Sequence, residues 1–454
     1  MSTQEKDGTM AMKETKLRVG MLVMLGTVLV IVCGAQLASA LMVEVPYEEE
    51  WASSGHADPN SEAFRHWDDE GEIPARCAKC HSTDGHLDFY GMDGTEAGVV
   101  DNPAPLGTTV ECIACHNDAT IDKDSVMFPS GLEVSGLGSS ARCMECHQGR
   151  ESGFSVDAAI ADANLPDDDT VSETLRFLNI HYLAAGSTLM GAEVHGGYQY
   201  AGKSYDVRLT HVEGFGSCVN CHDAHSLEVK TDKCATCHEL TETLGLEDIR
   251  YMGSLVDYDG DFNAEEGIYH EIADLMDILY GAIQVYAEAS GMPIVYDAHS
   301  YPYWFADPNN TGIAEGSYNG HFTARLLKAT YNYQFVMKDP GGYAHNPKYI
   351  IQLIFDSIED LDPALTTGLN RNDAGHFAGS EEAFRHWDDE GRVSGSCSTC
   401  HSAEGLPFLL AEGVSVSQPV ANGLMCSTCH DSIPEFTRYD VGPVVFPSGA
   451  VIDS

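Results

Sequence analysis

The sequence predicts a mainly α-helical and irregular fold with little β-structure. Three observations predict it. Seven Cys-x-x-Cys-His motifs are spread along the chain. Apolar residues recur at helical spacing in 264–290, and 346–360 opens with Asn346-Pro347, which is typical of a helix start. Segments rich in proline, asparagine and aspartate, such as 101–105 and 307–310, indicate loops.

The Cys-x-x-Cys-His motif is the attachment signal for haem c. Its two thiols form thioethers with the haem vinyl groups, and its histidine reaches the iron from one side. With 15 cysteines and 20 histidines in 454 residues, chance gives about 0.02 such motifs. Zinc knuckles would not require a histidine after the second cysteine of every motif. The motifs therefore predict seven covalent haems, which would supply the apolar core around them and leave little regular structure there.

The predicted attachment cysteines are Cys77, Cys80, Cys112, Cys115, Cys143, Cys146, Cys218, Cys221, Cys234, Cys237, Cys397, Cys400, Cys426 and Cys429. The predicted proximal ligands are His81, His116, His147, His222, His238, His401 and His430. Cys33 is the remaining cysteine. No disulfide framework is therefore expected in the folded part.

The N-terminus has the pattern of an export signal over residues 1–40. Basic residues precede an uncharged stretch from Gly20 to Met42, and Ala38-Ser39-Ala40 fits a small-residue cleavage site. Because about 20 apolar residues can span a bilayer, a retained membrane anchor is the alternative to cleavage after Ala40.

The charge balance restricts the partners. Lys and Arg number 24 against 70 Asp and Glu, so the formal net charge is −46. Such a surface repels nucleic acid and anionic lipid headgroups. The acidic surface either docks basic redox partners or cations, or simply keeps the protein soluble.

The chain contains an internal repeat. Residues 62–71 recur unchanged as 382–391. The same shift maps the Cys77 motif onto the Cys397 motif, and small length changes extend it to Cys112 and Cys426. We interpret the repeat as one dihaem module present twice. No counterpart of the Cys143 motif follows the second copy, so either this module is shorter or the chain is part of a longer protein.

These features predict four sections. They are the signal or anchor (1–40), an N-terminal trihaem module (41–150), a central helical section with a dihaem pair (151–372), and a C-terminal dihaem module (373–454) that repeats 54–131.

Function depends on the sixth ligand of each iron. A second histidine gives a closed centre suited to electron transfer, whereas an open position permits substrate chemistry. Thirteen histidines lie outside the motifs, which is enough for seven bis-histidine haems. The predicted distal ligands are His56, His66, His376 and His386, which recur with the repeat, and His181, His211 and His225, with His345 in reserve.

The acidic run Asp257-x-Asp259-x-Asp261 suggests calcium. Phe262 stands where an EF-hand needs glycine, and Ile268 stands where it needs the bidentate glutamate. The sequence therefore favours a solvated loop over an ion site.

The chain resembles multihaem c-type cytochromes of respiratory and extracellular electron-transfer systems. The resemblance rests on the seven motifs, on Cys221-His222-Asp223-Ala224-His225, and on the stretches 179–182 (Asn-Ile-His-Tyr) and 344–347 (Ala-His-Asn-Pro). It implies haem maturation outside the cytoplasm, in the periplasm or at the cell surface. Some members are catalytic and others form filaments, and the Cys-x-x-Cys-Lys site of pentahaem nitrite reductases is missing from this sequence.

Two functions follow. The first is a non-catalytic conduit that takes electrons from a quinol-linked donor or a periplasmic cytochrome and passes them to another cytochrome or an external acceptor. The second is an oxidoreductase with one open haem that acts on a small nitrogen or sulfur compound, with 239–372 shaping a pocket. The surplus of histidines favours the conduit. If the chain ends at Ser454, we expect the C-terminal module to dock head-to-tail on another cytochrome subunit.

Overall fold

The structure is a computed structural model that describes residues 45–212, 214–238, 240, 244–250, 256–373, 378–433 and 435–452. The predicted signal or anchor lies outside the described residues. Helices and irregular coil dominate, and the strands form sheets of two or three short strands. The prediction of a mainly α-helical and irregular fold is therefore confirmed.

The helices are α2 (Glu48–Ala52), α3 (Glu62–Arg65), α4 (Ala75–His81), α5 (Thr83–Phe89), α6 (Cys112–Cys115), α7 (Ser140–Met144), α8 (Gly153–Ala163), α9 (Ala185–Met190), α10 (Cys218–Cys221), α11 (Thr231–Cys234), α12 (Ile268–Ala289), α13 (Ala324–Met337), α14 (Gly342–His345), α15 (Pro347–Leu361), α16 (Glu382–Arg385), α17 (Ser398–His401), α18 (Gly405–Glu412) and α19 (Cys426–Cys429). Short 3-10 turns are η1 (Gly191–Glu193), η2 (Leu246–Asp248) and η3 (Pro363–Thr366).

The strands are β1 (Glu72–Ile73), β2 (Ala104–Pro105), β3 (Val126–Met127), β4 (Glu133–Val134), β5 (Ile294–Tyr296), β6 (Trp304–Ala306), β7 (Gly316–Ser317), β8 (Arg392–Val393), β9 (Gln418–Pro419), β10 (His430–Ser432), β11 (Thr437–Arg438), β12 (Val444–Val445) and β13 (Val451–Ile452). All the pairings between these strands are antiparallel, and β5-β6-β7 is a three-stranded sheet.

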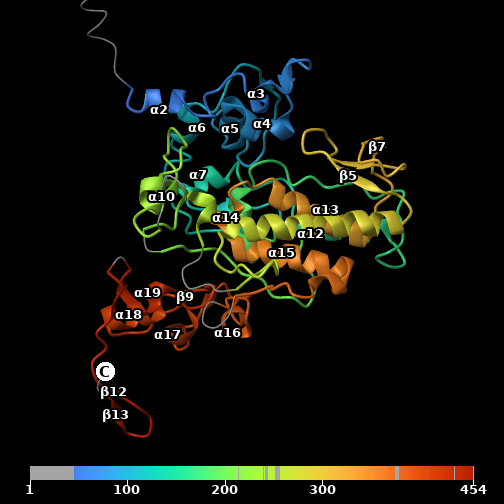
Figure 1. Cartoon of the computed structure of the whole chain (residues 1–454). Helices are drawn as coiled ribbons and strands as arrows, with labels where there is room; N and C mark the ends of the chain where they lie inside the picture. The colour runs from blue at the N-terminus through green and yellow to red at the C-terminus, as the bar shows by residue number, and fades with distance from the viewer. Residues whose placement is uncertain are drawn as a thin grey trace, which may run out of the picture.

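The main hydrophobic core lies in the central section, where α12, α13 and α15 pack together (Figure 1). On α12 the buried Ile272, Leu275, Leu279 and Ile283 recur every three or four residues and form one apolar face. The side chain of Asn346 caps α15 by accepting a bond from the N–H of Tyr349 at 3.3 Å, and proline occupies the first turn. The two helices predicted from sequence are confirmed.

The sections on either side of this core are built differently. In Figure 1 the N-terminal segment lies at one end of the molecule and the C-terminal segment at the other. Their helices are mostly of four to seven residues, too short to be stable alone. The C-terminal segment joins the core through Asn422, which accepts from the N–H of Val207 at 2.8 Å and donates to its carbonyl at 2.9 Å.

In the part of the chain that the structure describes, no helix combines the length and apolar character needed to cross a membrane.

Candidate haem sites

Each Cys-x-x-Cys-His motif lies on a short helix or at its end. The backbone N–H of the motif histidine donates to the carbonyl of the first cysteine, as in His116 to Cys112 at 2.9 Å and His222 to Cys218 at 2.8 Å. Residues three and four positions apart lie on the same face of such a turn. The local fold therefore gathers both thiols and the imidazole of a motif on one side.

Backbone carbonyls orient five of the motif histidines. Each of these rings places Nδ1 against a carbonyl oxygen, which can only accept, so Nδ1 carries the proton and donates it. Nε2 is then the nitrogen with the free electron pair, as a metal ligand requires. The bonds are His81–Ala63 (2.8 Å), His147–Leu183 (3.1 Å), His222–Leu227 (3.2 Å), His401–Ala383 (2.8 Å) and His430–Thr437 (3.1 Å).

Five motif histidines face a second imidazole at a nearly constant separation. Two imidazoles on opposite sides of one metal ion have ring centres about 6 Å apart, because each metal–nitrogen bond is about 2 Å and the centre lies roughly 1 Å beyond the nitrogen. The ring-centre separations are 5.8 Å for His81–His181, 6.2 Å for His116–His225, 6.2 Å for His147–His56, 6.5 Å for His222–His345 and 6.0 Å for His238–His211. These residues fit five bis-histidine irons.

Burial keeps several of these rings neutral. Burial, followed by the charge of His147, lowers the pKa of His56 to about 4. Burial, followed by the charge of His81, lowers the pKa of His181 to about 4. Burial likewise lowers the pKa of His211. Neutral imidazole is the form that binds a metal, so the protein environment favours ligation at pH 7.

In four of these five pairs the second histidine comes from a distant part of the chain. His56 faces the third motif rather than either of the first two, and His181 faces the first motif. His225, which follows the fourth motif, faces the second. His211 faces His238 of the central pair. The first three motifs and the central section are thus joined by facing histidines.

His345, which the sequence suggested as an additional candidate for a distal ligand, faces His222 of the fourth motif. The Asp339 carboxylate accepts from its Nδ1 at 2.9 Å. A carboxylate behind a ligating histidine fixes the ring orientation and the tautomer. Sequence reasoning did not single out Asp339, although its place six residues before His345 in a turn rich in glycine was a usable signal.

His66 and His386 lie in equivalent local settings at the surface. The side chain of His66 is 63% exposed and its Nδ1 lies 2.8 Å from Glu62; the corresponding values for His386 and Glu382 are 62% and 3.0 Å. The glutamate stands one helical turn before the histidine in both. His376 lies outside the described residues, so its predicted role as a ligand stays a prediction.

Motif cysteines from different sites lie near one another. The thiols of Cys80 and Cys146 are close enough to influence each other electrostatically, which brings the first and third sites together. The thiols of Cys143 and Cys218 are also close enough to do so, which brings the third and fourth sites together. Since a cofactor attached at these sulfurs lies close to them, three cofactors would be near neighbours.

The last two motifs have aromatic neighbours. Trp387 lies 5.0 Å from His401 between ring centres, as Trp67 lies 5.1 Å from His81. The ring of Phe436 stacks on His430 at 3.9 Å. The Trp–His contacts of the first and sixth motifs are thus alike at positions 320 residues apart.

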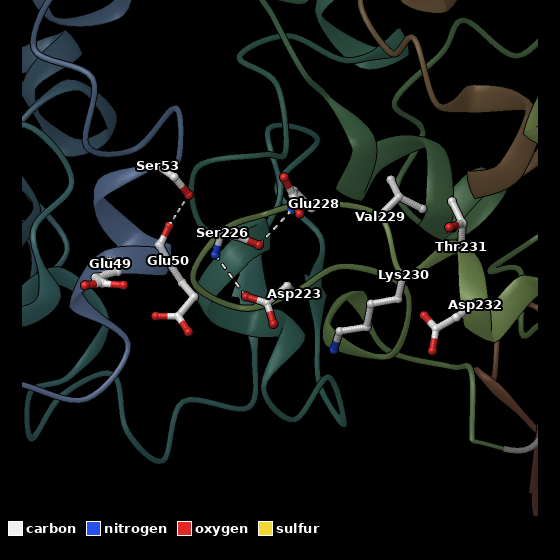
Figure 2. A pocket seen from close by; sticks show the side chains of 10 residues that line it. All are labelled: Glu49, Glu50, Ser53, Asp223, Ser226, Glu228, Val229, Lys230, Thr231 and Asp232. Atoms are coloured by element: carbon white, nitrogen blue, oxygen red, sulfur yellow. Dashed lines mark hydrogen bonds between the residues drawn. The ribbon is translucent and has the colours of Figure 1, made fainter.

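An open hollow of about 550 Å³ lies between α2 and the 223–232 segment. Figure 2 shows carboxylates of Glu49, Glu50, Asp223 and Asp232 around it, with Lys230 among them. It lies outside 239–372, the region to which the oxidoreductase hypothesis assigned a pocket.

The chain is similar to polyhaem cytochromes from Geobacter sulfurreducens. It is 26% identical over 381 residues to the C-type polyheme cytochrome OmcB, an alignment that covers 66% of this chain and 46% of OmcB. It is 27% identical over 405 residues to the C-type polyheme cytochrome OmcC, covering 72% of this chain and 48% of OmcC. The chain thus spans about half the length of these relatives. No family model and no solved structure matches it.

Proposed function

We propose that this multihaem c-type cytochrome conducts electrons along seven covalently bound haems, at least five of them bis-histidine. Its motifs and its polyhaem relatives support haem c and a part in electron transfer. The observation that carries the finer proposal is the set of five facing imidazole pairs at 5.8–6.5 Å. Two histidines on one haem would leave no position for a substrate and would suit electron transfer, as a conduit requires.

The protein's own contribution is to hold and order the sites. The neighbouring thiols of Cys80 and Cys146, and of Cys143 and Cys218, support a first site beside the third and a third site beside the fourth. The fourth and fifth motifs follow closely in sequence, and Cys221 and Cys234 lie near enough to influence each other electrostatically. His225 links the second site to the loop after the fourth. We infer the order first, third, fourth, fifth, with the second beside the fourth.

The C-terminal segment is proposed as a second copy of the N-terminal dihaem module. Carbonyls 320 residues apart orient His81 and His401. In the first copy, His181 and His225, which face the two motif histidines, come from outside the repeat. By analogy, distal ligands of His401 and His430 would come from outside 378–452. The prediction that His386 is a ligand competes with this proposal.

The site of action is proposed to be outside the cytoplasm, in the periplasm or at the cell surface. Haem c attachment takes place there, and residues 1–40 have the pattern of an export signal. Proposed partners are a quinol-linked donor or periplasmic cytochrome and a cytochrome or external acceptor. With a formal net charge of −46, the surface favours basic redox partners over nucleic acid.

Mass spectrometry of the protein, matured by a c-type cytochrome system, should show seven haem additions. Electron paramagnetic resonance of the oxidised protein should show low-spin ferric signals from at least five haems, because the facing imidazoles close those irons. Five or fewer haem additions would refute the proposal that every motif is occupied. A high-spin signal from more than two haems would contradict the five pairs and favour the oxidoreductase hypothesis.

The β12–β13 hairpin is proposed as the surface through which the C-terminal segment docks on a second copy of this chain. Val445 is 68% exposed and Ile452 55% exposed. In the corresponding hairpin of the first copy, β3–β4, Val134 is 3% exposed and belongs to a buried cluster with Ala141 and Met144 of α7. This likeness supports the proposal that β12–β13 takes an apolar cover.

Replacing Ile452 with aspartate should abolish concentration-dependent self-association in analytical ultracentrifugation, because the charge cannot be buried in an apolar contact. Glu133 occupies an exposed strand position in β4, so Glu133→Gln is the matched control and should leave association unchanged. A wild-type protein that stays monomeric at high concentration would count against this contact.

A further inference from the structure

The acidic loop before α12 joins the helical core to the segment that leads to the C-terminal motifs. The N–H of Asn370 donates to the carbonyl of Tyr258 at 3.0 Å, and the amide of Asn370 donates to the carbonyl of Asp257 at 2.5 Å. The Tyr258 hydroxyl also donates to Asp373. An interaction that holds this loop in one conformation therefore also holds residues 370–373 in place.

Two carboxylates of the loop region have protein donors on both oxygens. Asp257 accepts from the N–H groups of Gly260 at 2.6 Å and Phe262 at 2.8 Å. Glu271 accepts from Arg250 at 2.6 Å and from the N–H of Tyr258 at 2.7 Å. These bonds shape the turn and satisfy both oxygens of each carboxylate, so neither side chain needs a bound ion to explain its position.

Asp259 is different, because one of its oxygens has no partner. The residue is only 7% exposed, and its Oδ1 accepts from the N–H of Asp261 at 3.0 Å. Its Oδ2 is buried with no hydrogen-bond partner among the described residues, and the same is true of Oε1 of Glu266. An unsatisfied buried carboxylate oxygen is costly and needs an explanation.

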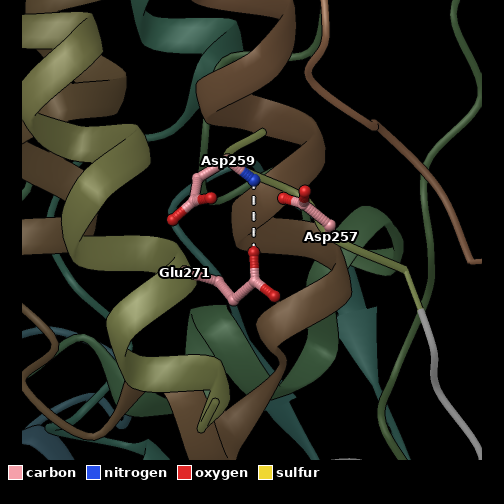
Figure 3. A group of neighbouring side chains, drawn as sticks. All are labelled: Asp257, Asp259 and Glu271. Carbon is pink, nitrogen blue, oxygen red and sulfur yellow. Dashed lines mark hydrogen bonds between the residues drawn. The ribbon is translucent and has the colours of Figure 1, made fainter. Parts of the chain in front are cut away.

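Other carboxylates surround Asp259. Ligand atoms of Asp259, Asp261 and Glu266 lie within 4.8 Å of one another, and so do those of Asp257, Asp259 and Glu271. In Figure 3 the carboxylates of Asp257 and Asp259 lie on either side of the bond from the Asp259 N–H to Glu271. Burial, with the negative charges of Glu271, Asp261 and Glu266, raises the pKa of Asp259 to about 7. Arg250 is ion-paired with Glu271, whereas the charges that act on Asp259 are those of the carboxylates around it.

We propose that Asp259, Asp261 and Glu266 bind a calcium ion that fixes this loop against residues 370–373. All three offer carboxylate oxygens, which are the ligands of hard cations, and Ca²⁺ tolerates irregular geometry and loop ligands better than Mg²⁺. The ion would satisfy both orphan oxygens at once. This inference goes beyond the proposed electron transfer and replaces the solvated loop favoured by the sequence.

The test is calcium binding to the haem-loaded protein, first treated with a chelator and then titrated with CaCl₂ in a calorimeter. One saturable site is expected, with a Kd of about 10⁻⁴ to 10⁻³ M or tighter, as in extracellular calcium modules. Hydrogen exchange should slow at 256–267 and 370–373 when calcium is added. Wild-type protein without saturable calcium binding would overturn the proposal and leave a protonated Asp259 as the explanation.

Asp259→Asn should weaken calcium binding at least about tenfold, because it removes a charged ligand. Glu265→Gln is the matched control, because Glu265 is exposed, stands next to Glu266 and belongs to neither carboxylate group. The calcium affinity of this variant should differ from that of the wild type by less than about twofold. If Asp259→Asn does not fold, Glu266→Gln should show the loss, since Glu266 is less buried. Equal effects of Glu265→Gln and Glu266→Gln would overturn the site and indicate only general attraction by negative charge.

Discussion

Replacing His181 with asparagine is expected to turn one low-spin haem into a high-spin haem. His181 faces His81 of the first motif at 5.8 Å between ring centres, so its loss opens the sixth position of one iron. Its backbone has φ 78°, a left-handed conformation that asparagine adopts more readily than most residues. The substitution therefore removes the imidazole without adding backbone strain.

The matched control is His66→Asn, which removes an imidazole that the sequence repeat also proposed as a ligand. His66 is paired with Glu62 at the surface, so this variant should keep every low-spin signal of the wild type. Electron paramagnetic resonance of both oxidised variants is the measurement. A new high-spin signal in His66→Asn, with none in His181→Asn, would reverse the assignment and restore His66 as the ligand of the first module.

The opened haem should also change its reduction potential. An imidazole donor stabilises ferric iron, so its loss at one site should raise the potential of that haem and leave the others nearly unchanged. Potentiometric titration followed by visible spectroscopy measures this. A uniform change in all potentials would instead indicate a general disturbance of the fold.

The local fold of the Cys-x-x-Cys-His motifs and the long helices could be predicted from local sequence. A Cys-x-x-Cys-His motif needs only one helical turn to gather its three groups, and α12 follows directly from the spacing of Ile272, Leu275 and Leu279. Both depend on residues within a few positions of each other. Tertiary structure does not need to be known for either.

The pairing of the histidines could not be predicted in the same way, because it depends on packing between distant segments. His56 lies near the first motif in sequence yet faces His147 of the third. His225 and His222 are three residues apart and face different partners. The sequence identifies which histidines are available, but the order in which the short helices pack decides which two face each other.

The repeat itself gives an ambiguous signal for His66. The repeat contains both Glu62-His66 and Glu382-His386, and each pair forms the same contact one helical turn apart. Recurrence of a histidine can therefore reflect a surface hydrogen bond as well as a ligand. The structure gives the hydrogen bond a physical basis, and the His66→Asn variant tests the other explanation.

Removing the third attachment site is expected to have the largest effect on both stability and electron transfer. Cys146→Ala removes one of the two thiols that would hold the third haem, at a site whose thiols lie near those of the first and fourth sites. The third motif also borders a buried cluster that includes Phe128 and Met144. Loss of this cofactor would leave a large cavity beside that cluster, and cavities of this kind cost several kcal/mol.

Cys429→Ala is the matched control, since it removes one thioether from the seventh motif. Cys429 is exposed, and its motif lies in the C-terminal segment, away from the core of the molecule (Figure 1). Mass spectrometry should show one haem fewer on each variant than on the wild type. Cys146→Ala alone should also increase proteolysis of the N-terminal segment and lower the midpoint of denaturant unfolding.

The kinetic consequence separates a conduit from a set of independent haems. If the third site connects the first to the fourth, stopped-flow reduction of Cys146→Ala should split into a fast and a slow phase, because electrons that enter on one side reach the other side slowly. Cys429→Ala should keep the wild-type time course, less one haem of amplitude. If Cys146→Ala keeps a single phase at the wild-type rate, electrons do not pass through the third site and the proposed order is wrong.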